Sequence, residues 1–115
     1  MVKVFIKGTP YSQNKRRGKV EAPKEWSEAI VEATAELPKI KFPCSLSAEF
    51  VLPGDKYPKD FPQGPDLDNL LKRLLDALQK TVLQDDSLVI QLEASKRQAR
   101  TGEPAGVYIS FDRRS

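Results

Sequence analysis

The sequence contains no histidine, a single cysteine and no long apolar segment, and each absence excludes a class of site or protein. Without histidine, the chain lacks the commonest general base and the commonest transition-metal ligand. One cysteine, Cys44, excludes an internal disulfide and a thiolate zinc site, and we expect it to be a small buried apolar side chain. No apolar run approaches about 18 residues and no signal peptide opens the chain, so we expect no membrane association and a cytoplasmic location.

A length of 115 residues suits one domain with a single modest core, so we expect residues 1–115 to form one unit. The net charge of +3 is unevenly spread, because residues 55–86 carry five basic and seven acidic side chains while both flanks are net basic. Such flanks could hold a polyanion while a cation occupies the acidic centre. Ordinary surface charge is the alternative explanation of the same distribution.

The pattern of apolar residues predicts an α/β fold, namely a small mixed β-sheet with two helices in the order β-α-β-α-β-β. Loops rich in proline, glycine or basic residues are expected over 8–22 and 53–65. A turn at 101–104 favours an antiparallel hairpin between the last two strands. The strands are expected over residues 2–7, 44–52, 88–94 and 107–111, and the helices over residues 23–37 and 67–82.

Acidic residues occur on both sides of the second helix. Asp66 and Asp68 precede or begin it, Lys72 lies one turn further along, and Asp85 and Asp86 follow it. Carboxylates that gather at one point repel one another unless a cation intervenes. Oxygen ligands without histidine or cysteine select Mg²⁺ or Mn²⁺, which can activate water against a phosphodiester. Convergence requires the chain to double back after the helix.

The same residues also have purely structural interpretations. Asp68 can cap the helix, and Asp68 with Lys72 forms an ordinary i,i+4 pair worth about 0.2–0.5 kcal/mol. The pair Asp85-Asp86 can form a turn before the next strand. Asp76 is better explained as a salt-bridge partner of Lys72 or Lys80 than as a metal ligand. Spacing alone therefore leaves the metal site open.

Four stretches of this chain resemble the RusA family of Holliday-junction resolvases. Residues 66–72 read Asp-Leu-Asp-Asn-Leu-Leu-Lys, which is similar to the family pattern D-x-D-N-x-x-K. The helix then contains Asp-Ala-Leu at 76–78, and Asp85-Asp86 follows as the pair of aspartates. Near the amino terminus, Pro-Tyr-Ser-Gln-Asn at 10–14 resembles the family's P-x-S-x-N stretch. Length and element order match over nearly the whole chain.

The resemblance implies a RusA-like, homodimeric, Mg²⁺-dependent endonuclease, with Mn²⁺ as a substitute, that nicks four-way DNA junctions symmetrically in recombination and repair. The essential acids of the family fall on Asp66, Asp68 and Asp86, which implies that they bind the metal. The catalytic lysine of the family falls on Lys72. Asp85 is expected to be an additional ligand or to support the ligands. Lys96 matches a basic family position and is expected to contact phosphate.

The basic loop near the amino terminus is the other expected DNA contact. Its side chains could grip the backbone or open the crossover, although a solvated charged loop is the alternative. A non-catalytic DNA-binding module, in which the acids only cap and pair, is the second hypothesis for the whole protein. A nucleotide phosphotransferase is disfavoured because no phosphate-binding glycine loop is visible. The loop residues concerned are Asn14, Lys15, Arg16, Arg17 and Lys19.

Overall fold

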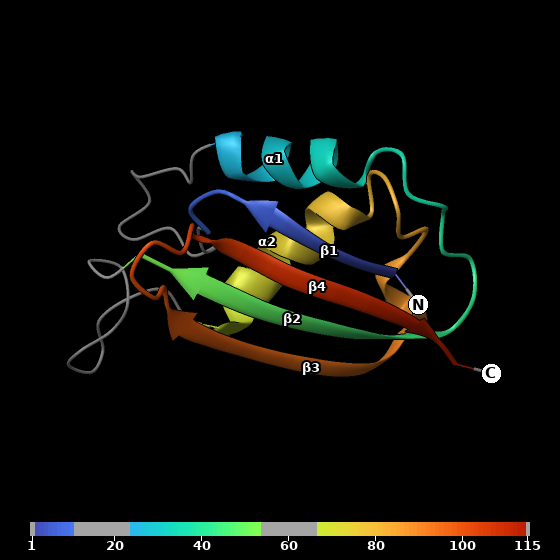
Figure 1. The fold of residues 1–115 in the computed structure, drawn as a ribbon. Coiled ribbons are helices and arrows are strands. Elements are labelled where there is room, and N and C mark those ends of the chain that lie inside the picture. Colours follow the sequence, from blue (N-terminus) through green and yellow to red (C-terminus); the bar gives the residue numbers. More distant parts are fainter. Residues whose placement is uncertain (1, 11–23, 54–66, 115) are drawn as a thin grey trace, which may run out of the picture.

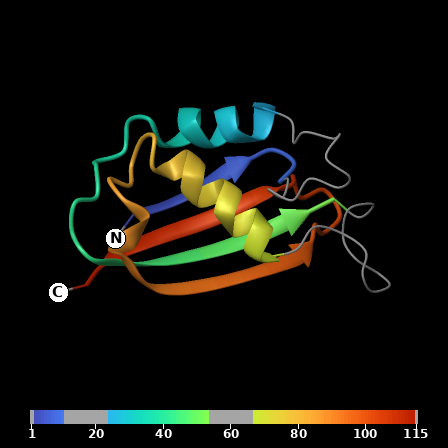
Figure 2. The same cartoon turned by 180° about the vertical axis from the view of Figure 1, so that it is seen from behind.

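The computed structural model describes residues 2–10, 24–53 and 67–114, and both helices lie on one face of a four-stranded sheet (Figure 1, Figure 2). This arrangement confirms the predicted α/β fold and its β-α-β-α-β-β order. The elements are β1 (Val2–Lys7), α1 (Lys24–Thr34), β2 (Cys44–Leu52), α2 (Leu67–Leu78), the 3₁₀ helix η2 (Asp86–Leu88), β3 (Val89–Gln98) and β4 (Gly106–Arg113). The two predicted loops lie mostly outside the described residues. None of the helices in the described ranges is long and apolar enough to cross a bilayer.

The strands are ordered β1-β4-β2-β3, so the sheet is mixed. Strand β4 lies antiparallel between β1 and β2, whereas β3 pairs in parallel with the other side of β2. The predicted hairpin between the last two strands is therefore wrong, because β3 and β4 are not neighbours. A parallel pair needs a crossover connection, and α2 provides it between β2 and β3.

One hydrophobic core fills the space between the helices and the sheet. Trp26 and Ile30 of α1 are buried in it. Only part of the predicted leucine stripe of α2 is fully buried in the same core. Cys44 is fully buried, as expected, and burial raises the pKa of its thiol. The fully buried leucines of α2 are Leu70, Leu74 and Leu78, while Leu67, Leu71 and Leu75 are only half buried.

Both helices end earlier than predicted. The chain after α1 continues in a tighter turn, in which the amide of Leu37 bonds to the carbonyl of Thr34. After α2, the amide of Leu83 bonds back to the carbonyl of Leu78, and Leu83 then forms a parallel bridge with Ile40. These bonds hold the segment after α2 beside the segment before β2, and the Asp85-Asp86 pair follows this segment directly.

Strand β3 differs most from its prediction. It extends to Gln98, four residues beyond the expected end, because polar side chains on an edge strand do not need burial. The expected half-buried alternation is also incorrect for Ile90 and Leu92, which are 61% and 45% exposed. Leu92 pairs with the buried Leu46 and so lies on the helix-covered face, but at the uncovered edge of that face.

Candidate active site

The first turn of α2 presents one acid and one base to solvent. Asp68 and Lys72 are both exposed and lie one helical turn apart. The partial positive charge at the amino end of a helix attracts negatively charged side chains in the first turn, where Asp68 lies. Asp66, the other acid of the predicted motif, lies outside the described residues. This end of α2 can therefore offer a carboxylate and an ammonium group to the same ligand.

Asp85 and Asp86 lie just before β3, and Asp86 is the first residue of η2. The Oδ1 atom of Asp85 accepts a hydrogen bond of 2.8 Å from the amide of Ser87 and so caps η2. That backbone bond, followed by the Ser87 hydroxyl, lowers the pKa of the Asp85 carboxyl. The amide of Asp86 donates to Oε1 of Gln79 at 3.3 Å, which ties the pair to the end of α2. Asp85 thus has a structural role, and both Asp85 and Asp86 are exposed.

The two acidic positions lie at opposite ends of the crossover. Because β2 and β3 are parallel, α2 runs back against them, starting near the carboxyl end of β3 and ending near its amino end (Figure 1, Figure 2). The twelve residues of α2 span about 18 Å. Asp68 and Asp86 are therefore not brought together within one chain. The strand after the helix does return, as the prediction required, but Asp86 is at the start of the return.

The described residues of one chain do not form a complete metal site. Among them, no group of three or more histidine, cysteine or acidic side chains lies close enough to hold an ion. The available donors are carboxylate oxygens, which fit Mg²⁺ or Mn²⁺ in chemistry. Asp68 is the described acid at the amino end of α2, and by itself it cannot complete such a site.

Lys96 lies at the end of β3 that adjoins the start of α2. It pairs with the buried Phe50, so its side chain starts from the helix-covered face of the sheet, and it is partly buried. A lysine can place its apolar stem along such a surface and extend its ammonium group toward solvent. The basic loop predicted to contact DNA, residues 14–19, lies outside the described residues.

The family model for endodeoxyribonuclease RusA matches residues 7–111. The chain belongs to the RusA family. It is therefore a member of a family of endodeoxyribonucleases, and the motif at the start of α2 and the pair before β3 both fall within the match. A comparison with curated proteins finds no match.

A feature of this chain that the sequence did not predict is an ion-pair network near the end of β3. The guanidinium of Arg97 donates two hydrogen bonds to Glu103, of 2.8 and 2.7 Å, and approaches Glu49 at 3.4 Å. Hydrogen bonds from Arg97, then from the amide of Arg100, lower the pKa of Glu103 to about 2. The network connects β2, β3 and the β3–β4 turn. A single sequence gives no signal for it, because the partners belong to separate elements.

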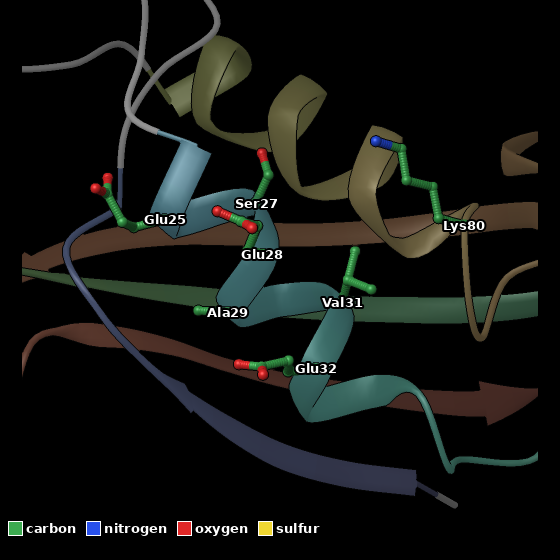
Figure 3. A pocket seen from close by; sticks show the side chains of 7 residues that line it. All are labelled: Glu25, Ser27, Glu28, Ala29, Val31, Glu32 and Lys80. Carbon is green, nitrogen blue, oxygen red and sulfur yellow. The ribbon is translucent and has the colours of Figure 1, made fainter.

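A shallow hollow of about 610 Å³ lies along α1, on the side that faces the end of α2 (Figure 3). Its charged lining is mostly acidic, with Glu25, Glu28 and Glu32 from α1 and Lys80 from the turn after α2. None of the residues that line the hollow is among those expected to bind the metal ion or DNA.

Proposed function

We propose that the protein is a Mg²⁺-dependent endonuclease that resolves four-way DNA junctions by symmetric nicking, with Mn²⁺ as a substitute. Two observations support this proposal: the family match over residues 7–111, and the exposed Asp68 and Lys72 one turn apart at the amino end of α2. The second observation carries the chemistry, because a carboxylate beside an ammonium group can hold a cation against a phosphate. We also propose a cytoplasmic location, as expected from the sequence, since the substrate would be DNA.

In this proposal, Asp66, Asp68 and Asp86 bind the metal ion and Lys72 contacts the scissile phosphate. Because Asp68 and Asp86 lie at opposite ends of α2 within one chain, the Asp86 carboxylate of a site would come from a second copy of the chain. A divalent ion held by carboxylates activates a water nucleophile and stabilises charge on the leaving oxygen. Lys72 would offset the negative charge that develops on the phosphate in the transition state. Its position one turn after Asp68 keeps both side chains on the same part of the α2 surface.

Symmetric nicking requires two equivalent sites, which a two-fold homodimer would supply. The basic loop with Asn14, Lys15, Arg16, Arg17 and Lys19 would contact the backbone of the junction arms, and so would Lys96. Asp85 would hold the turn that carries Asp86, through its bond to the Ser87 amide.

Cleavage of a labelled four-way junction, beside a linear duplex of the same sequence, tests this function. We expect symmetric nicks in the junction with Mg²⁺ and none with chelator. Asp68→Asn should abolish cleavage and retain junction binding, because it removes a ligand without removing the DNA contacts. Glu32→Gln, which alters an exposed acid on α1, is the control and should cleave as the wild type does. If wild-type protein binds junctions but leaves them intact with Mg²⁺, the protein is a non-catalytic DNA-binding module.

A further inference from the structure

Four basic side chains gather at the end of the sheet where β2 begins and β4 ends. Lys39 and Lys41 lie in the segment before β2, whereas Arg113 and Arg114 lie at the end of β4 and just beyond it. All four residues are exposed. The segment before β2, in teal, and the end of β4, in red, reach the same end of the sheet in both views (Figure 1, Figure 2). We call these four residues the basic cluster.

Backbone hydrogen bonds hold the end of β4 beside the segment before β2. The amide of Arg114 donates to the carbonyl of Pro43 at 2.8 Å, and Arg113 pairs in register with Cys44. The guanidinium of Arg113 also lies over the ring of Phe42, 4.6 Å from the ring centroid. A guanidinium that stacks on a ring keeps its N–H groups, which lie in its own plane, available for other partners. Arg113 is therefore oriented in advance for an anionic ligand.

The two lysines of the basic cluster flank a buried residue. Ile40 is 4% exposed, whereas Lys39 and Lys41 on either side of it are exposed. Because successive side chains of an extended segment point in opposite directions, both lysines project away from the core. The amide of Ile40 donates to the carbonyl of Val82, and the amide of Gln84 donates to the carbonyl of Ile40. The lysines are therefore held beside the segment that follows α2.

The cations of the basic cluster have no ion-pair partner in the part of the chain that the structure describes. Arg97 is the contrasting case, because Glu49 and Glu103 already contact its guanidinium. Asp112 precedes Arg113 in β4, but adjacent side chains of a strand point to opposite faces of the sheet. Exposed positive charges that no carboxylate neutralises create a local potential that attracts a polyanion.

The basic cluster lies close to Asp86. Gln84, which bonds to Ile40, is two residues before Asp86, and two residues of chain span at most about 7 Å. Because the cluster and Asp86 belong to the same end of the fold, the cluster accompanies this carboxylate into the metal site that it joins. DNA held for cleavage at that site would pass its backbone beside the cluster.

We infer that the basic cluster binds the phosphate backbone of DNA next to the cleaved phosphate, as a contact site separate from the loop over 14–19 and from Lys96. This inference rests on the proposed function, because it concerns the DNA that the nuclease would cleave. The family match favours DNA over other polyanions. Arg113 and Arg114 can each donate paired N–H bonds to one phosphate, and the two lysines add point charges. Phosphate contacts carry no sequence information, so the cluster would hold DNA of any sequence.

The salt dependence of DNA binding tests the basic cluster without reference to cleavage. Fluorescence anisotropy of a labelled four-way junction, with Ca²⁺ in place of Mg²⁺, gives the binding constant at several salt concentrations. Each phosphate contact that is lost should reduce the slope of log K against log salt by about 0.9, so a double variant, Lys41→Gln with Arg113→Gln, should reduce it by about 1.8. An unchanged slope in this double variant would overturn the inference.

Lys80→Glu is the matched control for the double variant. It also lowers the net charge by two, but Lys80 lines the hollow along α1 and is not part of the basic cluster. Its slope should equal that of the wild type, and its melting temperature and that of the double variant should show that both are folded. A decrease in slope as large as that of the double variant would mean that net charge alone governs binding, which would also overturn the inference.

Phe42→Leu tests whether the ring orients Arg113. The substitution should weaken junction binding by about 2–5-fold in the wild-type background, which is the contribution expected of an exposed cation–π contact. It should have no further effect once Arg113→Gln is present, because the guanidinium is then absent. An equal loss in both backgrounds would show that the ring acts through the structure alone and would overturn its role in orienting Arg113.

Cleavage with Mg²⁺ separates a failure of this inference from a failure of the proposed function. At sub-saturating protein, the double variant should cleave more slowly in proportion to its lost affinity, whereas Lys80→Glu should cleave as the wild type does. If the double variant shows the reduced slope but wild-type protein never cleaves, the nuclease proposal is wrong and the DNA contact remains. If wild-type protein cleaves but the double variant keeps the full slope, the DNA contact is wrong and the nuclease proposal remains.

Discussion

The hydroxyl oxygens of Thr34 and Thr81 lie 2.6 Å apart and join the end of α1 to the turn after α2. The Thr34 hydroxyl donates to the carbonyl of Ile30 at 2.7 Å, so the Thr81 hydroxyl is the donor in the threonine pair. Thr34 is the buried polar residue of the described core. This bond fixes the path of the chain that leads to Asp86.

Thr34→Val should destabilise the fold by about 1–2 kcal/mol, because it preserves shape but leaves the Thr81 hydroxyl without its acceptor. Urea unfolding measures the change. Thr101→Val, in the exposed β3–β4 turn, is the control and should alter the free energy of unfolding by less than about 0.5 kcal/mol. Equal changes in the free energy of unfolding at both positions would show that the hydrogen bond between Thr34 and Thr81 does not stabilise the fold.

The pair between Arg97 and Glu103 should make stability depend on acid pH. The pKa of Glu103 falls from 4.5 to about 2 on folding, so the unfolded chain binds the proton more readily. The contribution of the pair is therefore complete above about pH 4.5 and is lost as the pH falls toward 2. Melting temperatures between pH 2 and 6 should decline less steeply in Glu103→Gln than in wild type. The same substitution at the exposed Glu36 should leave the slope as in wild type.

The fold was largely predictable from local patterns in the sequence, but the order of the strands was not. The bounds of β1 and β2 match their predictions because β-branched and alternating apolar residues mark them directly. The hairpin prediction failed because a turn at Gly102 shows only that the chain reverses, and not which strand it then joins. Strand β4 instead enters between β1 and β2, where Val107, Ile109 and Phe111 reach the core.

The sequence was sufficient to predict which residues belong to the candidate site, but not where they lie relative to one another. The residues around Asp68 and Lys72 form a local motif, and their shared surface follows from helical spacing alone. The position of Asp86 depends on the parallel pairing of β3 with β2, a long-range contact that no local pattern encodes. For the same reason, the exposure of Leu92 emerged only from the structure.

Gly106 should resist substitution more than Gly102. A Cβ at Gly106 would overlap the carbonyl oxygen of Ile6 and lie 2.6 Å from the ring of Phe5, across the β1–β4 pair. Gly106→Ala should therefore cost about 1–3 kcal/mol or more through displaced backbone. Gly102 has a φ of +81° with no atom within 4 Å of a built Cβ, so Gly102→Ala should cost about 1–2 kcal/mol. Chemical denaturation compares them, and a larger loss at Gly102 would contradict the packing argument.

Lys72→Ala should reduce the single-turnover rate of junction cleavage by about 10²–10³-fold. The reason is that the ammonium group would stabilise negative charge on the phosphate, and this charge develops mainly in the transition state. Junction affinity, measured by gel shift with Ca²⁺ in place of Mg²⁺, should fall far less than the rate. Lys72→Arg should recover part of the rate, since it restores the charge but not the compact ammonium group. Lys80→Ala, an exposed lysine beyond the opposite end of α2, is the matched control and should cleave at the wild-type rate. If Lys72→Ala lowered affinity and rate equally, Lys72 would be a binding contact for the junction rather than a catalytic group.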